Sequence, residues 1–267
     1  MSELERIKAE IAAKGVKKIV VSLSGGLDST TLLHAMVKVL GAENVFSLSF
    51  SYGQRHDVEL FLAKKTCKEL GVKHKIINLS FLGDIVSNVS AMVKGSVATP
   101  RADDLEAGKQ VPTYVPFRNS ILSSITFAFA ESVGADAIAL GVQYGDYENS
   151  DTYYYWDCSK AFTETMQQLA DLNDKHKISY VAPFVKLTKK DEIKLGNELG
   201  VDYAKSWTCY NPVQDLKRIV YTHDPAGGRN EKIERFYEPC GVCPSCVGRA
   251  NAFKELGLED PQQGVWM

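Results

Sequence analysis

The chain has 267 residues, of which 45% are hydrophobic and 24% are charged, and its formal net charge is −2 at pH 7. This composition excludes a disordered chain and favours one large folded domain, or a domain with an appendage. The near-neutral charge gives no electrostatic reason to expect a nucleic-acid or membrane partner, and it favours small substrates.

Residues 1–14 are expected to form an amphipathic helix, because Leu4, Ile7 and Ile11 recur at helical spacing among charged residues. This pattern is not that of a secretory signal. No segment is apolar over a length that could span a bilayer. With the nucleotide site argued below, these features predict a cytoplasmic enzyme whose six cysteines stay reduced.

Short apolar segments then alternate with segments of helical periodicity. Strands are expected at residues 18–23, 44–50, 75–79, 136–142 and 178–181. Helices are expected at 32–40 and 58–70, from about Phe117, and from a capping box of Thr188 and Asp191 to Leu199, whereas 80–115 is expected to be a polar loop. The alternation predicts an α/β fold with a doubly wound parallel sheet, whose ligands bind at the carboxyl ends of the strands.

The turn after the first strand, residues 24–30 with the sequence SGGLDST, is the most informative stretch. Its small residues let backbone N–H groups converge on an oxyanion, and the start of a helix adds partial positive charge. Ser24, Ser29 and Thr30 can donate hydroxyl hydrogen bonds to phosphate, and we expect Asp28 to orient a magnesium ion. The alternative is that Asp28 and Ser29 only cap a helix.

No lysine follows the two glycines, and their spacing is not that of a dinucleotide-binding turn, so neither of these common nucleotide loops is present. The run from Ser24 to Ser29 instead resembles the pyrophosphate loop of the N-type ATP pyrophosphatases. These enzymes share a parallel-sheet fold and split ATP between its α and β phosphates to adenylate a substrate. They include GMP synthetase, NAD synthetase and tRNA-thiolating enzymes, and the loop alone does not choose among them.

Three cysteines near the C-terminus, Cys240, Cys243 and Cys246, have the spacing at which successive turns aim sulfur atoms at one tetrahedral ion. A fourth ligand is required, and Cys209 is the best candidate, with Cys67 and Cys158 as competitors. We interpret Cys67 as a small core residue of its helix. A closed four-thiolate site favours structural zinc. An iron–sulfur cluster or a redox cluster is the alternative.

Further stretches resemble one family within this group, the 7-cyano-7-deazaguanine synthases of the queuosine pathway. The stretches that carry the resemblance are Val21–Thr31, Ser51–His56, Pro112–Asn119, Gly134–Asp136, Gly141–Val142, Asp157–Cys158, Leu199–Tyr203, Trp207–Tyr210 and the cysteine triplet. Together they span most of the chain. The resemblance implies a homodimeric enzyme that takes 7-carboxy-7-deazaguanine, ATP and ammonia and makes the 7-nitrile.

The chemistry implied by this resemblance explains the need for ATP. A carboxylate is inert to amines because its leaving group would be oxide, so transfer of AMP creates a mixed anhydride that ammonia can attack. The product is an amide. Adenylation of the amide oxygen supplies a second leaving group, and its departure forms the nitrile.

The resemblance also implies roles for individual residues. Those expected to hold ATP are Leu23, Ser24, Gly25, Gly26, Leu27, Asp28, Ser29, Thr30, Arg55, His56 and Lys189. Those expected to take part in catalysis are Ser24, Asp28, Ser29 and Arg118. Those expected to bind the substrate are Arg118, Gly141, Asp146 and Asp157. For Arg55, His56 and Lys189 the alternative is a solvated surface position.

Two departures from the family pattern leave questions open. About thirty residues separate Cys209 from the triplet, where the family has a short loop, and one role for this insertion is to cover the active site. The second departure is the run Tyr153–Cys158, which leaves the acceptor for the deazaguanine ring undecided. The aromatic stretch Tyr144–Trp156 suits a base platform and a subunit interface equally well.

The predicted organisation is therefore an α/β domain at residues 1–205 and a small zinc-binding module at 206–267, with an inserted loop at about 211–239. Three other functions remain open. The first is a related ligase that passes the activated acid to another amine, possibly on a protein. The second is tRNA thiolation, against which the near-neutral charge counts. The third is a zinc-stabilised nucleotide-binding regulator without turnover.

Overall fold

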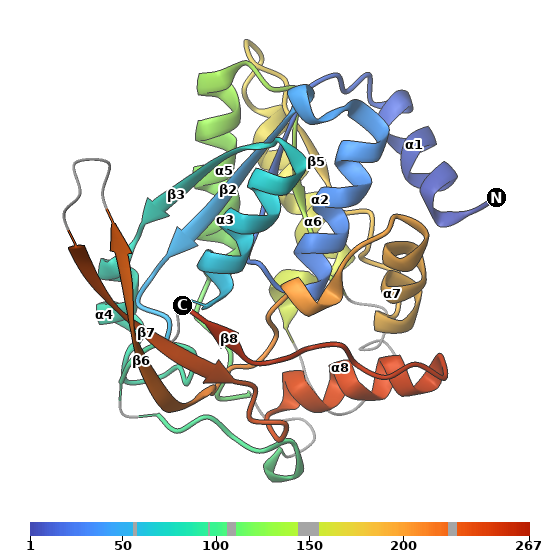
Figure 1. Cartoon of the computed structure of the whole chain (residues 1–267). Coiled ribbons are helices and arrows are strands. Elements are labelled where there is room, and N and C mark those ends of the chain that lie inside the picture. The colour runs from blue at the N-terminus through green and yellow to red at the C-terminus, as the bar shows by residue number, and fades with distance from the viewer. Residues whose placement is uncertain (56–57, 96, 106–110, 144–154, 224–228) are drawn as a thin grey trace.

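A five-stranded parallel sheet in the order β3-β2-β1-β4-β5 forms the centre of the fold (Figure 1). The computed structural model describes residues 1–55, 58–95, 97–105, 111–143, 155–223 and 229–267. The five strands are β1 (Ile19–Ser22), β2 (Val45–Ser51), β3 (Lys73–Asn78), β4 (Ala137–Leu140) and β5 (Ser179–Val181). In register, Ile19 of β1 lies opposite Val45 on one side and Ala137 on the other. The strand order reverses between β1 and β4, which places the switch point of the sheet there.

Helices cover both faces of this sheet, as a doubly wound fold requires. Helices α1 (Glu3–Ala13), α2 (Leu27–Leu40), α3 (Val58–Leu70) and α7 (Lys189–Glu198) pack on the face that carries Ile19 and Val21. Helices α4 (Ser80–Val86), α5 (Arg118–Val133) and α6 (Lys160–Asp171) pack on the face that carries Val20. Alternate residues of β1 are thus buried in two separate cores, which explains why Ile19, Val20 and Val21 are all apolar.

The remaining elements belong to the last quarter of the chain or are single 3-10 turns. An antiparallel sheet in the order β6-β7-β8 consists of β6 (Val213–His223), β7 (Arg229–Glu238) and β8 (Val265–Trp266), and α8 (Pro244–Glu255) follows β7. The 3-10 turns lie at Ala42–Asn44, Ala102–Asp104, Trp156–Cys158 and Tyr203–Lys205. In Figure 1 the β6–β7 hairpin stands away from the parallel sheet, and α8 lies below it.

The predicted α/β class and all five predicted strands are confirmed, with bounds that shift by a few residues. The capping box of α7 is confirmed too, since Thr188 Oγ1 accepts from Asp191 N and the Asp191 carboxylate accepts from Thr188 N. The polar loop expected at 80–115 was wrong at its start, where α4 forms. Leu82 and Val86 are buried there. A helix of seven residues is too short to give a repeated apolar pattern in the sequence.

The segment expected as an inserted loop contains a regular hairpin, because β6 and β7 pair antiparallel from Val213 opposite Glu238 to His223 opposite Arg229. Helices α6 and α8 were not predicted. No helix in the described part of the chain is both long enough and apolar enough to cross a membrane.

Candidate active site and metal centre

The turn between β1 and α2 is built on a glycine that no other residue could replace without strain. Gly25 has φ +91°, and a Cβ added there would lie 2.2 Å from the carbonyl oxygen of Glu59 in α3. Gly26 is the N-cap of α2 and makes no side-chain capping hydrogen bond. Asp28 and Ser29 therefore lie within the first helical turn, where their side chains are available for roles other than capping.

Two hydroxyl groups meet in this turn. Ser24 Oγ lies 2.9 Å from Ser29 Oγ, and the backbone N–H of Ser24 donates to Ser29 Oγ over 3.1 Å. The N–H of Gly26 donates to Ser24 Oγ over 3.2 Å. This concentration of donors at a helix N-terminus has the character of an oxyanion site.

The turn lines part of a cavity of about 540 Å³. The lining residues from the turn and from the start of α7 are Leu23, Ser24, Gly26, Leu27, Asp28, Ser29 and Lys189. Gly141, which follows β4, also lines it, and a Cβ there would lie 3.2 Å from the backbone of Asp28 and Ser29. The cavity therefore opens at the carboxyl ends of β1 and β4, beside the switch point of the sheet. Thr30 is buried and lies behind the lining.

Lys189 at the start of α7 forms an ion pair with Asp28, and its Nζ lies 3.7 Å from Glu192 Oε2. Burial alone would raise the pKa of Asp28, but Lys189 and the contact with Glu192 outweigh it and hold the pKa below its usual value. Burial would lower the pKa of Lys189, and Asp28 and Glu192 raise it instead. Burial and the Asp28 carboxyl raise the pKa of Glu192 well above its usual value.

Glu192 was not predicted as a site residue from the sequence. In the structure its side chain has 0% exposure. The available signal was an acid directly before Ile193 on the apolar face of α7, one turn after Lys189. An acid at such a position is costly to bury and indicates a specific partner.

Arg118 is the first residue of α5 and lines the cavity. It follows Phe117, whose φ of +54° is unusual for a residue with a side chain and stores strain at the entry to the helix. Burial opposes the charge of Arg118, but Tyr52, Tyr210 and Asp157 more than compensate and raise its pKa. Arg118 thus presents a permanently charged planar donor group within the cavity.

Asp157 lies behind this arginine rather than on the cavity surface. Its side chain is buried, its Oδ2 accepts from the backbone N–H of Asn119 over 3.3 Å, and burial raises its pKa while Arg118 lowers it. Its visible contacts hold the start of α5. Cys158 does line the cavity. Burial, and to a smaller extent the negative charge of Asp157, raises the pKa of its thiol to about 12.

Apolar and aromatic residues from other elements also line the cavity. Its lining residues include Phe50, Tyr52, Met92, Leu105, Val111, Leu122 and Tyr155. The hydroxyl of Tyr155 lies 2.6 Å from Thr113 Oγ1. From the predicted aromatic stretch, Tyr155 therefore lines the cavity, whereas residues 144–154, including Asp146, lie outside the described residues. His56 lies outside them as well.

Arg55 makes contacts away from the cavity. Its Nε donates to the carbonyl of Ala91 over 2.8 Å, and its guanidinium also donates to the carbonyl of Val97. These bonds hold the segment after α4 against the end of β2. None of the described residues of the β6–β7 hairpin lines the cavity either, so the structure gives no support for the hairpin as its cover.

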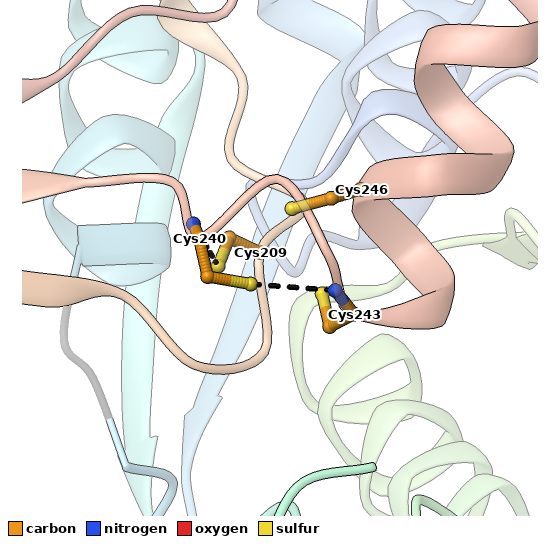
Figure 2. A group of neighbouring side chains, drawn as sticks. All are labelled: Cys209, Cys240, Cys243 and Cys246. Atoms are coloured by element: carbon orange, nitrogen blue, oxygen red, sulfur yellow. Dashed lines mark hydrogen bonds between the residues drawn. The ribbon is translucent and has the colours of Figure 1, made fainter. Parts of the chain in front are cut away.

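The four cysteines predicted as metal ligands come together in the C-terminal module (Figure 2). The sulfur atoms of Cys209, Cys240, Cys243 and Cys246 all lie within 4.8 Å of one another. The N–H of Cys240 donates to Cys209 Sγ over 3.2 Å, and that of Cys243 donates to Cys240 Sγ over 3.4 Å. Such bonds support thiolates, so the donor set fits a tetrahedral metal with four sulfur ligands. Cys67 is buried in the core on the inner face of α3, as predicted.

The C-terminal module, the segment from Ser206 onward that carries the four-cysteine cluster, is joined closely to the α/β core. Arg249 of α8 is 1% exposed, pairs with Asp260 over 2.9 Å, and donates to Ser206 Oγ over 2.8 Å and to the carbonyl of Tyr203 over 2.8 Å. Trp207 and Arg249 both line the cavity. The module therefore forms part of the cavity wall.

Known proteins resemble the chain over nearly its full length. The 7-cyano-7-deazaguanine synthase of Caldicellulosiruptor saccharolyticus is 38% identical over 91% of this chain and 94% of the relative. That of Psychromonas ingrahamii is 36% identical over 92% of this chain and 96% of the relative. That of Rhodopirellula baltica is 37% identical over 96% of this chain and 95% of the relative. The family model described as "Queuosine biosynthesis protein QueC" matches residues 18–257. The chain therefore belongs to the queuosine biosynthesis protein QueC family, a family of enzymes.

Proposed function

We propose that the protein is an ATP-dependent carbon–nitrogen ligase that converts 7-carboxy-7-deazaguanine and ammonia into 7-cyano-7-deazaguanine. The observation that carries this proposal is that one cavity of about 540 Å³ is lined by the glycine turn, by Arg118 and by apolar and aromatic residues. The names of the relatives support the same product.

In the first step the turn holds the β and γ phosphates of ATP, with Ser24, Ser29 and the backbone N–H groups as donors. Arg118 binds and orients the substrate carboxylate, whose oxygen attacks the α phosphorus. The bond from that phosphorus to the bridging oxygen breaks, pyrophosphate leaves, and an acyl adenylate forms. Lys189 neutralises charge on the departing pyrophosphate. A magnesium ion near Asp28 would supply further neutralisation when bound.

Ammonia then attacks the acyl carbon, AMP leaves with the former carboxylate oxygen, and loss of protons gives the amide. The amide oxygen attacks the α phosphorus of a second ATP and again releases pyrophosphate. Loss of AMP and of both protons on nitrogen from this intermediate forms the carbon–nitrogen triple bond. Two ATP are converted to two AMP and two pyrophosphate for each nitrile, and both carboxylate oxygens end in AMP.

We propose that the four-cysteine centre holds zinc in a structural role, because a closed set of four thiolates leaves no open coordination position for chemistry.

Gly141 gives the substrate and ATP close access to the start of α2, and Asp157 acts by holding the start of α5, which bears Arg118. Following the family resemblance, we further propose that the enzyme is a cytoplasmic homodimer that acts on small molecules and binds no nucleic acid stably.

The test is incubation of the purified protein with 7-carboxy-7-deazaguanine, ATP and ammonium, with products identified by mass spectrometry. The proposal expects the nitrile, with two AMP per nitrile and the amide as a transient. Adenylate or amide without nitrile would favour the related ligase that serves another amine. Metal analysis of the same preparation should give one zinc per chain, whereas iron with visible absorption would identify an iron–sulfur cluster.

A further inference from the structure

Glu192 is a carboxyl group without solvent exposure that lies directly behind the ammonium of Lys189. It follows Lys189 by one turn of α7, and its Oε2 lies 3.7 Å from Lys189 Nζ. Within the described part of the chain, neither of its carboxyl oxygens makes a hydrogen bond of ordinary length. Burying such a group is costly, so its presence calls for a role that offsets the cost.

The backbone around Glu192 is fixed to the helix that carries Asp28. The hydroxyl of Tyr203 donates to the carbonyl of Glu192 over 3.1 Å and lies 2.8 Å from Thr31 Oγ1 of α2. Gly196, one turn further along α7, leaves room for this hydroxyl, because a Cβ there would lie 1.8 Å from it. The two helices are therefore held in one relative position, with Asp28, Lys189 and Glu192 between them.

This arrangement leaves Lys189 with two acidic neighbours of different kinds. Asp28 lines the cavity and contacts Lys189 from the solvent side, whereas Glu192 faces it from the protein interior. Phosphate entering the turn competes with Asp28 for the same ammonium. A second contact from behind would keep that ammonium aimed at the cavity when its bond to Asp28 weakens.

We infer that Glu192 is a positioning residue for ATP, which holds Lys189 and Asp28 so that the ammonium faces the phosphates in the turn. The inference rests on the proposed function, because it takes a triphosphate as the ligand of the turn. Glu192 touches neither ATP nor the acid and acts through Lys189.

The test compares two substitutions of nearly equal size. Glu192→Gln keeps a polar oxygen beside Lys189 and adds an N–H that could donate to Asp28, so ATP binding should stay within about 3-fold of wild type. Glu192→Leu removes both possibilities, and ATP should bind about 10-fold more weakly or worse. Binding is measured by calorimetry with ATP alone, so the result does not depend on which acid the enzyme activates. The KM for the carboxylated substrate should not change, which a general loss of packing would not allow.

A double-mutant cycle shows whether Glu192 acts through the lysine. In a Lys189→Met background, Glu192→Leu should weaken ATP binding by less than about 2-fold more, because the group that it positions is gone. Glu198→Leu, an exposed position on the same helix, serves as the matched control and should bind ATP normally.

Normal ATP binding by Glu192→Leu, or full additivity of its loss with that of Lys189→Met, would overturn the inference. So would a Glu192→Gln variant as defective as Glu192→Leu. If Glu192→Leu does not fold, Glu192→Asp replaces it, because a carboxyl withdrawn by one methylene should also weaken ATP binding while the KM of the acid stays unchanged. A wild-type protein that binds no ATP would instead contradict the proposed function.

Discussion

The backbone N–H of Trp207 donates to the carbonyl of Gly25 over 2.9 Å. This bond joins the C-terminal module to the glycine turn that is proposed to hold pyrophosphate. The indole of Trp207 is fully buried, and its Nε1 donates to the carbonyl of the metal-centre residue Cys209 over 3.0 Å. The cysteine cluster and the glycine turn are thus connected through Trp207. A structural change at either one should therefore alter the geometry of the other.

Loss of the metal should therefore weaken ATP binding as well as stability. We expect Cys243→Ala to lose the bound metal and most solubility, because structural zinc contributes free energy of folding directly. Chelation of the wild-type protein should lower ATP affinity by about 10-fold or more, together with a change in Trp207 fluorescence. Cys67→Ala, a change in the core away from the cluster, should keep one metal per chain. Full metal content in Cys243→Ala would remove that cysteine from the site.

Gly25→Ala should distort the glycine turn for two reasons. Alanine disfavours the positive φ of this position, and its Cβ would collide with the carbonyl oxygen of Glu59. Gly15 offers a matched control, because its φ is also positive at +66° but no atom lies within 4 Å of an added Cβ. We expect Gly15→Ala to cost about 1–2 kcal/mol of unfolding free energy with ATP binding intact. Gly25→Ala should cost more and abolish ATP binding. Equal effects of the two substitutions in denaturant unfolding would show that the contact with Glu59 is unimportant.

Ser24→Ala and Asp28→Ala should each abolish most pyrophosphate release while leaving the fold intact. Ser24 Oγ meets Ser29 Oγ at the turn, and Asp28 holds Lys189, so either change removes part of the group that faces the leaving pyrophosphate. By analogy with the loss of one preorganised donor, kcat should fall about 100-fold. The measurement is pyrophosphate release in the presence of the acid substrate. Wild-type turnover in either variant contradicts the assigned roles.

Arg118→Lys should behave as a loss of function, although it preserves the charge. A carboxylate is bound best by the planar fork of a guanidinium, which an ammonium does not reproduce. We expect kcat/KM for the acid to fall about 30-fold or more, while ATP binds as in the wild type. Arg218→Lys, on the exposed hairpin, is the control and should leave both constants unchanged. A parallel loss of ATP affinity would assign Arg118 to the phosphates instead.

Stability should fall on mild acidification because of His74. Its Nε2 lies 2.8 Å from Ser49 Oγ, and burial followed by the charge of Lys64 lowers its pKa from 6.5. The unfolded chain then binds more protons than the folded one below about pH 6.5, so the unfolding free energy decreases as pH falls through the lowered pKa. Urea unfolding between pH 5 and 8 measures this. His74→Gln should flatten part of the slope, and an unchanged slope would assign it to other groups such as His34.

Local patterns were enough to predict the sheet, the glycine turn and the cysteine cluster. Strand and helix periodicity over five to fifteen residues placed all five strands of the core, and the spacing of Cys240, Cys243 and Cys246 predicted three members of the cluster that lie within one short segment. The helices that were missed, α4, α6 and α8, each bury few residues along one face, and in α6 these are Phe162 and Met166 alone. Such helices contain fewer apolar residues in a row than β1, whose first three residues are all buried.

The sequence by itself determined that the chain forms a doubly wound parallel sheet with a glycine turn after its first strand, because those features depend on neighbours within a few residues. Only the tertiary structure decided which distant side chains complete the site. Asp28 and Lys189 are 161 residues apart in the chain, so no local pattern predicts their ion pair, and Glu192 carried no local motif. Such contacts arise when helices pack on a common sheet, and packing joins residues whose separation in sequence leaves no periodic signal.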